Sequence, residues 1–522
     1  MGYGVVWFKR DLRLHDHAPL AEAALRGPVL AIHCLERSLW AQPDMSGAHL
    51  GFLRECLRDL ERALARRGVP LQVITGEAVE IFEALHAAEP FTDLWSHEES
   101  GTLATWDRDK AVQAWCKARS VTWHELPSGG VVRRLRDRDR WHGIWEARMA
   151  QPQVPVPALV SGGPLLRSDP PSEFRPAVLD SWDPPDRQRG GRTMAVPLLR
   201  EFLESGGRGY RRGMSSPLSA PEACSRLSPY LAYGCLGMRE VVQAVRRRRR
   251  QIRDGLGGST RDLEAFESRL HWQAHFIQKF ETEPSLSEAT MHPEYEGLWD
   301  REAHPERFQA LTAGRTGWPM VDACVAMLRQ TGWINFRMRA MLVSTATGAL
   351  WLDWRPVGLW LARRFVDYEP GIHWSQVQMQ AGTTGINLPR IYNPVKQARD
   401  HDPEGVFVRR WLPAMREVPE PWLFEPWRVP DIIRSSETGG LPAPLVDLEA
   451  ALREARSRIH AWRARPEVRA GKAEVIRKHA SRAPRRPSSR IRRKDLAKER
   501  LVQPQAQLTL GLTEGVPEDA TG

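Results

Sequence analysis

The sequence predicts a protein of the α/β plus all-α class, in which a doubly wound, parallel five-stranded sheet at the N-terminus precedes a large helical domain. Two observations predict this order. Within residues 1–130, short apolar or β-branched runs alternate with amphipathic segments, and strands that are separated by helices form parallel sheets. From residue 196 to residue 465, tryptophan, leucine and arginine recur at spacings of three and four residues, which is the periodicity of helices.

The N-terminal elements can be assigned in order along the chain. We expect helices at 48–67, 77–88 and 102–119, and strands at Gly4–Phe8, Pro28–Leu35, Leu71–Thr75, Asp93–Ser96 and Thr122–Leu126. In such sheets a ligand lies beyond the C-terminal ends of the strands, which are here Lys9–Arg13, Glu36–Arg37 and His97–Glu99. No GxGxxG motif follows the first strand and no GxxxxGK[ST] motif occurs, so the usual glycine-rich phosphate loops are absent.

Two segments differ from the domains in composition. Residues 131–195 are rich in proline, glycine, arginine and aspartate, which is typical of an interdomain linker. Residues 466–522 are expected to form a basic disordered tail. The formal net charge is +11, yet residues 451–500 alone carry 18 basic and 5 acidic side chains, and residues 1–450 sum to +1. The positive charge that suggests a nucleic-acid partner therefore lies mainly near the C-terminus.

The composition excludes several classes of protein. The 522 residues are 42% hydrophobic and 27% charged, as in soluble globular proteins, so the chain is neither wholly disordered nor collagen-like. Six cysteines without a CxxC pair argue against a disulfide scaffold or a zinc ribbon. The longest apolar run, Ala340–Leu352, is shorter than the roughly 20 residues of a membrane span. Because the N-terminus also lacks a signal peptide, we expect a cytoplasmic protein without membrane contact.

A polar segment, Cys224–Pro229, precedes an expected helix at Tyr230–Leu236. Ser225 and Ser228 flank Arg226 there. Hydroxyls, backbone N–H groups and a guanidinium at the start of a helix would hold a phosphate or a pyrophosphate. The simpler alternative is a serine that only caps the helix.

Two further pairs of side chains are spaced for binding. His271 and His275 lie one helical turn apart, but no third ligand such as the glutamate of an HExxH motif accompanies them, so we predict no metal site. Arg337 and Arg339 point to different sides of a helix, so that one can face a buried anion and the other a groove. The segment after Asp367 is typical of a tight loop between helices, where binding residues are often placed.

Several of these segments together resemble the DNA photolyase/cryptochrome family. The likeness runs from residue 4 to about residue 415, in order and at the family's spacing, and it rests on Trp7–Arg13, 224–236, 315–323, 331–339 and 390–405. It implies an N-terminal α/β domain that can hold an antenna chromophore and a helical domain that holds a U-shaped FAD. In the family, light excites the reduced flavin, which donates an electron to a pyrimidine dimer flipped out of the DNA duplex.

The resemblance also implies which side chains contact FAD. Arg339 and Asp367 match a buried pair beside the isoalloxazine, where a cation stabilises the anionic reduced flavin. Cys224 stands where relatives usually have threonine. The full set of expected FAD contacts is Tyr210, Cys224, Ser225, Arg226, Leu227, Ser228, Phe266, Arg339, Asp367, Tyr368 and Glu369.

In this family a chain of tryptophans connects FAD to the surface and supplies electrons. Trp374 matches the member next to the flavin, Trp354 matches the middle member, and Trp299 is the candidate for the surface end. For each of the 21 tryptophans the alternative is simple packing in the core or at an interface.

The resemblance assigns five side chains to the DNA. Trp272 matches the aromatic residue that stacks on the flipped dimer, and Arg337 and Arg390 match arginines that contact phosphates. Arg269 stands where dimer photolyases have glutamate, and Gln273 where they have arginine. The leading hypothesis is a DNA photolyase, a carbon–carbon lyase that repairs UV-induced pyrimidine dimers. A cryptochrome-like blue-light photoreceptor without repair, and a flavoprotein that only binds nucleic acid, are the alternatives.

The remaining expectations concern the antenna, the tail and the partners. Lys9, Arg10, Asp11 and Arg13 are candidate contacts of an antenna chromophore of folate or flavin type. Gln507–Leu512 resembles the QL[SD]LF peptide that binds bacterial sliding clamps, tethered behind a basic linker. The protein is expected to be a monomer that acts on DNA containing pyrimidine dimers.

Overall fold

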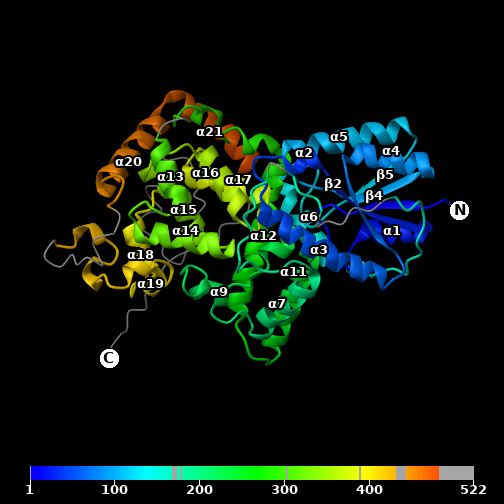
Figure 1. The fold of residues 1–522 in the computed structure, drawn as a ribbon, viewed down its shortest axis with the longest axis horizontal. Coiled ribbons are helices and arrows are strands. Elements are labelled where there is room, and N and C mark those ends of the chain that lie inside the picture. Colours follow the sequence, from blue (N-terminus) through cyan, green and yellow to red (C-terminus); the bar gives the residue numbers. More distant parts are fainter. Residues whose placement is uncertain are drawn as a thin grey trace, which may run out of the picture.

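The computed structural model describes residues 2–166, 173–176, 179–300, 304–386, 390–430 and 443–480. Figure 1 shows two parts, an N-terminal sheet with its helices in blue and cyan and a helical domain in green to orange. The long helix α12 (Thr260–Thr282) lies between the sheet and most of the other helices of the second part. The predicted fold class, a parallel sheet followed by a helical domain, is confirmed.

The five strands form one parallel sheet in the order β3-β2-β1-β4-β5. Neighbouring residues of a strand point to opposite faces, so Val6 packs with α1 and α3 while Val5 packs with α4 and α5. The sheet is therefore covered by helices on both sides. Its elements are β1 (Gly4–Trp7), α1 (Ala18–Arg26), β2 (Val29–Leu35), α2 (Arg37–Trp40), α3 (Gly47–Ala65), β3 (Leu71–Thr75), α4 (Ala78–Ala88), β4 (Asp93–His97), α5 (Leu103–Ala118) and β5 (Thr122–Leu126).

The helices of the second domain begin and end where the sequence signals it. Pro319 and Pro370 open two of them, and Gly332 and Gly382 end the same two with positive φ angles of 65° and 88°. Besides α12, the helices are α7 (Arg192–Glu204), α8 (Tyr210–Gly213), α9 (Ala220–Ala223), α10 (Ser228–Ala232), α11 (Met238–Arg253), α13 (Pro305–Ala313), α14 (Pro319–Thr331), α15 (Phe336–Ser344), α16 (Trp354–Arg364), α17 (Pro370–Ala381), α18 (Pro394–His401), α19 (Val406–Trp411), α20 (Leu448–Ala464) and α21 (Pro466–His479).

The segment 131–195 is not the wholly irregular linker that its composition predicts. It contains the short turn η1 (Arg138–Arg140) and the helix α6 (Trp141–Ala150). Trp141, Trp145 and Met149 are spaced by four residues and are all buried, so one face of α6 joins the core. Charged residues surround these three, so the composition of the segment does not reveal its apolar helix face.

The first part of the segment expected to be a disordered tail is helical instead. α21 occupies Pro466–His479, and its Val468 and Val475 are buried in the same core as α20. The two valines are seven residues apart, which places them on the same face of the helix, so this face can join the core although the stretch is highly charged. Residues 481–522, including the clamp-like Gln507–Leu512, lie outside the described residues.

The loop after β1 fastens the sheet to the helical domain. Arg10 donates from Nε to the carbonyl of Ala232 (3.0 Å) and from Nη2 to that of Tyr368 (2.8 Å). Arg13 Nη1 donates to the carbonyl of Gly234 at 3.0 Å. Gly234 has φ +66°, and a Cβ there would lie 2.3 Å from the carbonyl oxygen of Arg10. Only glycine permits this close approach.

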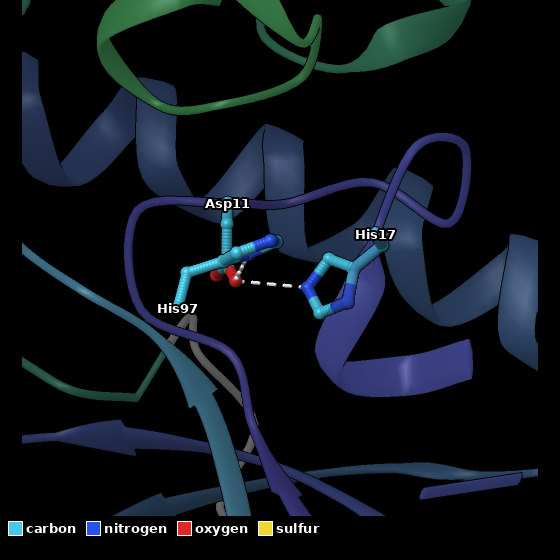
Figure 2. Close-up of side chains that lie close together, drawn as sticks. All are labelled: Asp11, His17 and His97. Atoms are coloured by element: carbon cyan, nitrogen blue, oxygen red, sulfur yellow. Dashed lines mark hydrogen bonds and ion pairs between the residues drawn. The ribbon is translucent and has the colours of Figure 1, made fainter. Parts of the chain in front are cut away.

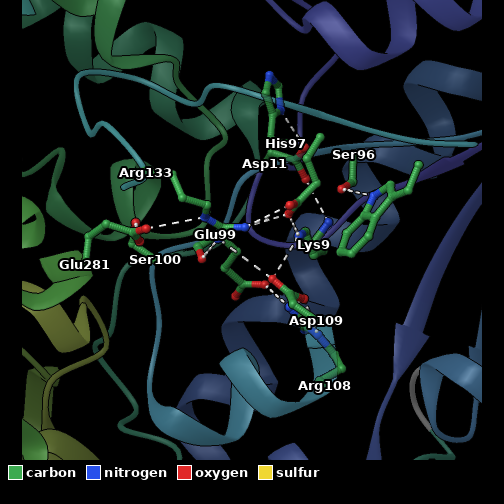
Figure 3. Close-up of polar contacts among 12 residues, drawn as sticks. Lys9, Asp11, Ser96, His97, Glu99, Ser100, Arg108, Asp109, Arg133 and Glu281 are labelled. Atoms are coloured by element: carbon green, nitrogen blue, oxygen red, sulfur yellow. Dashed lines mark hydrogen bonds and ion pairs between the residues drawn. The ribbon is translucent and has the colours of Figure 1, made fainter. Parts of the chain in front are cut away.

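A second contact between the domains is a network of charged side chains, shown in Figure 3. Arg133 lies 2.9 Å from Glu125 and 3.3 Å from Glu281, and Ser100 Oγ donates to Glu281 at 2.7 Å. Glu281 belongs to α12, whereas Ser100 lies between β4 and α5 and Arg133 lies in the segment that follows β5. Burial outweighs the attraction of Arg133 and raises the pKa of Glu281 to about 7.

Replacing Glu281 with glutamine should change how stability depends on pH. The folded-state pKa of about 7 exceeds the ordinary value of 4.5, so the folded protein holds the extra proton between these pH values and stability falls as pH rises through them. Glu281→Gln has no such titration. The free energy of unfolding of the variant, relative to that of the wild type, should therefore rise by about 2–3 kcal/mol from pH 5 to pH 8. Urea unfolding at both pH values measures the difference, and parallel behaviour of the two proteins would contradict it.

Candidate functional site

The helical domain encloses a cavity of 630 Å³. Its walls come from α8, α10, α12, α15, α16, α17, α20 and α21 together with adjoining loops. All of the residues expected to contact FAD, and all five expected to contact DNA, line it. The structure thus brings together segments that are up to 180 residues apart in the sequence, from Tyr210 to Arg390. A cavity of this volume is within the usual range for cofactor sites.

One wall of the cavity carries an ion pair between α15 and the segment before α17. Arg339 donates from Nη1 and Nη2 to the two carboxylate oxygens of Asp367, at 3.0 and 2.9 Å. Its Nε donates to the carbonyl of Ile334 at 2.8 Å, and its guanidinium lies 4.1 Å from the ring centroid of Phe365. This two-point contact fixes the plane of the guanidinium. The structure thus pairs Arg339 with Asp367, the two residues that the resemblance places together.

A second wall is the segment from Cys224 to Ser228. Arg226 has a left-handed backbone, with φ +54°, and its guanidinium lies 3.9 Å from the ring centroid of Trp333. α10 begins at Ser228, two residues earlier than predicted, because Pro229 suits the first turn of a helix. Burial raises the pKa of the Cys224 thiol to about 11, so Cys224 offers a neutral S–H where a hydroxyl is usual in the family.

Two buried oxygens of the cavity wall lack partners. Asn335 donates its amide to the carbonyls of Met214 (3.1 Å) and Ser215 (2.8 Å), which leaves Oδ1 buried and unpaired. Glu369 lies 3.8 Å from Arg10 through one oxygen, and its other oxygen is buried and unpaired. Buried polar atoms normally have partners, so both atoms are suited to receive N–H or O–H donors from a ligand.

The mouth of the cavity, by which we mean its solvent-exposed side at Phe336 and Arg390, is cationic. It carries the ring of Trp272, which packs against His275 and Phe276 of the same helix. The carboxylates that line the cavity are Asp367 and Glu369, and both face arginines. The basic side chains of the lining outside those pairs are Arg226, Arg269, Arg337, Arg390, Arg463 and Lys472.

Two of the three predicted electron-transfer tryptophans touch behind this cavity. The rings of Trp354 and Trp374 lie 5.9 Å apart, nearly perpendicular, and both are buried. Trp374 donates to the hydroxyl of Tyr368 at 3.1 Å, and Tyr368 lines the cavity. Trp299, the candidate for the surface end, is instead a buried residue that is 4% exposed, and its ring packs against Trp351.

The C-terminal edge of the sheet holds a buried trio of polar side chains, shown in Figure 2. Asp11 accepts from Nε2 of His17 at 2.8 Å and from Nδ1 of His97 at 2.7 Å. His17 Nδ1 accepts from the backbone of Leu20, so its Nε2 carries the proton that Asp11 receives. Burial lowers the pKa of both imidazoles, that of His97 to about 3. The trio is thus a hydrogen-bonded structure of neutral imidazoles and a carboxylate.

The four candidate antenna residues after β1 all interact with other residues of the chain. Lys9 lies 3.8 Å from both Asp109 and Glu125, and Asp11 belongs to the trio. Arg10 and Arg13 bind backbone carbonyls of the helical domain. Lys9, Asp11 and Arg13 are each less than 7% exposed. These residues do not fit a second chromophore: Arg10 and Arg13 belong to the contact between the domains, and Lys9 and Asp11 bind side chains of the N-terminal domain.

Sequence reasoning missed several side chains of the cavity. Asn335 lines the cavity and lies inside the recognised segment 331–339, so the motif could have identified it as a site residue. Trp333 lies in the same segment and covers Arg226. Arg463 and Lys472 come from α20 and α21, and no sequence signal pointed to them because Lys472 falls in the stretch expected to be disordered.

Comparison with known proteins agrees with this geometry. The family model described as DNA photolyase matches residues 4–135, and the model described as the FAD binding domain of DNA photolyase matches residues 266–461. A deoxyribodipyrimidine photo-lyase of Streptomyces griseus is 30% identical over 483 residues, which cover 88% of this chain and 99% of that protein. The chain belongs to the photolyase/cryptochrome family.

Other members of the photolyase/cryptochrome family are similar over most of their length. A cryptochrome DASH of Gloeobacter violaceus is 28% identical over 487 residues, covering 86% of this chain and 95% of that protein. The crystal structure of a class III photolyase from Agrobacterium tumefaciens superposes with a TM-score of 0.78 at 25% identity, covering 89% of this chain and 98% of that one. Within the described part of the chain, no helix has the length and apolarity to cross a membrane.

The residues present fit the FAD that this domain of the photolyase/cryptochrome family binds. Arg226 and the hydroxyls of Ser225 and Ser228 offer donors for a pyrophosphate on one wall. The unpaired oxygens of Asn335 and Glu369 accept donors from a flavin or a ribitol. Arg339 supplies a fixed positive group where a reduced flavin needs one.

The Arg339–Asp367 pair should show strong energetic coupling. Asp367→Leu leaves a partly buried guanidinium without its partner and should cost about 3–5 kcal/mol of stability. Arg339→Met combined with Asp367→Leu should cost less than the sum of the single changes, by about 1.5 kcal/mol or more. Thermal unfolding of the four proteins and their flavin content measure this, with the exposed pair Lys396–Asp400 as the matched control. Additive costs would contradict the prediction.

Proposed function

We propose that this protein is a light-driven, FAD-dependent DNA photolyase that repairs UV-induced pyrimidine dimers. The observation that carries the proposal is that one cavity joins the Arg339–Asp367 pair to a cationic mouth beside Trp272. The family and the photo-lyase names of its relatives agree with it. When bound, reduced FAD supplies the electron that splits the dimer under blue light.

The chain's own residues would position the lesion. Trp272 presents a partly buried ring on which a flipped base can stack, a contact worth about 1–3 kcal/mol per base. Arg337 reaches the hydroxyl of Tyr392 at 3.3 Å, and with the exposed Arg390 it places positive charge where flanking phosphates would pass. Extruding the dimer into the cavity removes it from water and brings it toward the wall that carries Arg339.

A cryptochrome-like photoreceptor without repair is the second candidate function. Arg269 and Gln273 replace the glutamate and arginine that dimer photolyases use, so the cavity offers donors where those enzymes offer a carboxylate. The 28% identical cryptochrome DASH belongs to the same set of relatives. In this alternative, light would reduce the flavin through Trp374 and change the conformation of the C-terminal region, and no dimer would be reversed.

Light-dependent reversal of dimers in a defined oligonucleotide tests the proposal. The purified protein with reduced flavin should restore a strand carrying a cyclobutane or a (6-4) dimer under blue light but not in the dark. Trp272→Ala is the matched variant, because it should keep its flavin while its affinity for the damaged strand falls about 10–100-fold. Binding of the damaged strand without reversal of either dimer under light would reject repair and favour the photoreceptor.

The buried tryptophan pair gives a separate prediction. Trp354→Phe should reduce the blue-light reduction of oxidised, protein-bound flavin to a small fraction of the wild-type rate, because the only described aromatic ring contact of Trp354 is with Trp374. Repair by chemically reduced protein should be unchanged. Trp318→Phe, another fully buried tryptophan of the same core, is the control. Equal photoreduction in Trp354→Phe and wild type would contradict the role of the pair.

Lys472 should contribute one phosphate contact to DNA binding. Lys472→Gln should weaken binding to undamaged and damaged DNA alike and reduce the slope of log K against log salt by about 1, because it removes one charge from the mouth. Arg469→Gln removes an exposed charge from the same helix outside the cavity and is the matched control. Equal salt slopes for both variants would place Lys472 away from the DNA. Filter binding or fluorescence anisotropy measures these slopes.

A further inference from the structure

A row of ionisable side chains lies along α12 and its C-terminal cap residue, outside the cavity lining. His275, Lys279 and Glu283 follow one another at intervals of four residues. Arg138 of η1 packs on the first of them, with Nη2 2.6 Å from Nδ1 of His275. His479, the last residue of α21, packs on the third, with Nε2 2.7 Å from Glu283. Three segments that are distant in sequence meet along this row.

The ring of His275 has a buried N–H group, at Nε2, that lacks a hydrogen-bond acceptor. Arginine only donates hydrogen bonds, so Nδ1 of His275 accepts from Arg138 and the ring proton resides on Nε2. Nε2 is buried and unpaired. Burial, together with the charges of Lys279 and Arg138, holds the pKa of His275 well below its ordinary value, so the ring is neutral and Nε2–H remains a donor.

Lys279 is a buried ammonium without a counter-ion. Its residue is 6% exposed, and its Nζ lies 5.2 Å from the ring centroid of Phe276. Burial lowers the pKa of Lys279 to about 7, with a further contribution from Arg138, and no carboxylate of the described residues opposes this. A buried charge without a partner is costly, by several kcal/mol in general.

Glu283, one turn further along the helix, is not the missing counter-ion. Its carboxylate is held by Lys478 at 2.9 Å and by His479 at 2.7 Å. Because Nε2 of His479 donates to that carboxylate, the other ring nitrogen, Nδ1, is left buried and unpaired, in a residue that is 1% exposed. The row therefore combines an ammonium and an N–H donor with an imidazole nitrogen that becomes a donor on protonation.

We propose that His275, Lys279 and His479 form a buried binding site for a small inorganic oxyanion such as phosphate or sulfate. An oxyanion supplies the acceptors that both donors lack and the negative charge that Lys279 lacks. A metal ion is disfavoured, because Nε2 of His275 carries a proton and the nearby cations repel it. A DNA phosphate is disfavoured too, since the three residues are 3%, 6% and 1% exposed and a nucleic-acid strand cannot reach them.

A bound oxyanion would join α12 to α21 and would thereby also affect the position of the rest of α21. α21 also carries Lys472, which lines the mouth of the cavity. Holding the end of α21 through His479 keeps that helix docked, in addition to the burial of Val468 and Val475. The site and its test are independent of the proposed repair activity, because they concern only how the C-terminal helix is held.

Thermal unfolding of the full chain in phosphate-free buffer and at increasing inorganic phosphate, at constant ionic strength, tests the proposal. Phosphate should raise the unfolding midpoint of the wild type along a saturating curve, by about 2–4 °C. Lys279→Met keeps the volume and removes the charge, so it should lose this increment. Without phosphate it should unfold at or above the wild-type temperature, because an unpaired buried charge has been replaced by an apolar group.

Lys396→Met is the matched control, since it makes the same substitution at an exposed lysine outside both the row and the cavity lining. It should keep the wild-type phosphate increment. Equilibrium dialysis with labelled phosphate gives a second readout that does not depend on unfolding, and Lys279→Met should bind one phosphate fewer per chain. Equal phosphate increments in wild type and Lys279→Met, or loss of the increment in Lys396→Met, would overturn the site.

Discussion

The close approach of the loop after β1 to the end of α10 is the contact on which the rest of the structure depends. At Gly234 the two backbones come so near that a Cβ would lie 2.3 Å from the carbonyl oxygen of Arg10. Arg10 and Arg13 then bind the carbonyls of Ala232 and Gly234. α10 begins at Ser228, so the same contact that joins the domains also fixes the wall of the cavity that carries the serines and Arg226.

From this contact the N-terminal domain reaches the other walls as well. Arg10 also binds the carbonyl of Tyr368 and faces Glu369, and both residues line the cavity. Tyr368 in turn accepts from Trp374, which packs on Trp354. The residues at the strand ends, where α/β folds usually bind a ligand, are thus used to position the neighbouring site, and the parallel sheet acts as its support.

The sequence predicted the strands and most of the site because each depends on local or motif signals. The five strands are short apolar runs, and all predicted FAD and DNA contacts line one cavity. It failed where burial depends on tertiary context. Trp299 is buried against Trp351, α21 buries Val468 and Val475 although its sequence is highly charged, and the cation at Lys472 reaches the cavity from outside the recognised motifs. Composition alone could not reveal these contacts, because each is made with a distant segment.

The central claim is that one cavity receives both FAD and a DNA lesion. Residues 1–450 sum to only +1, so in the proposed function DNA recognition would depend on the local cations at the mouth. A crystal structure of the flavin-loaded protein with a dimer-containing duplex tests this most directly. The account predicts the dimer outside the helix stack, against Trp272, with its flanking phosphates at Arg337 and Arg390. A duplex bound on another face, with the dimer still stacked, would contradict it.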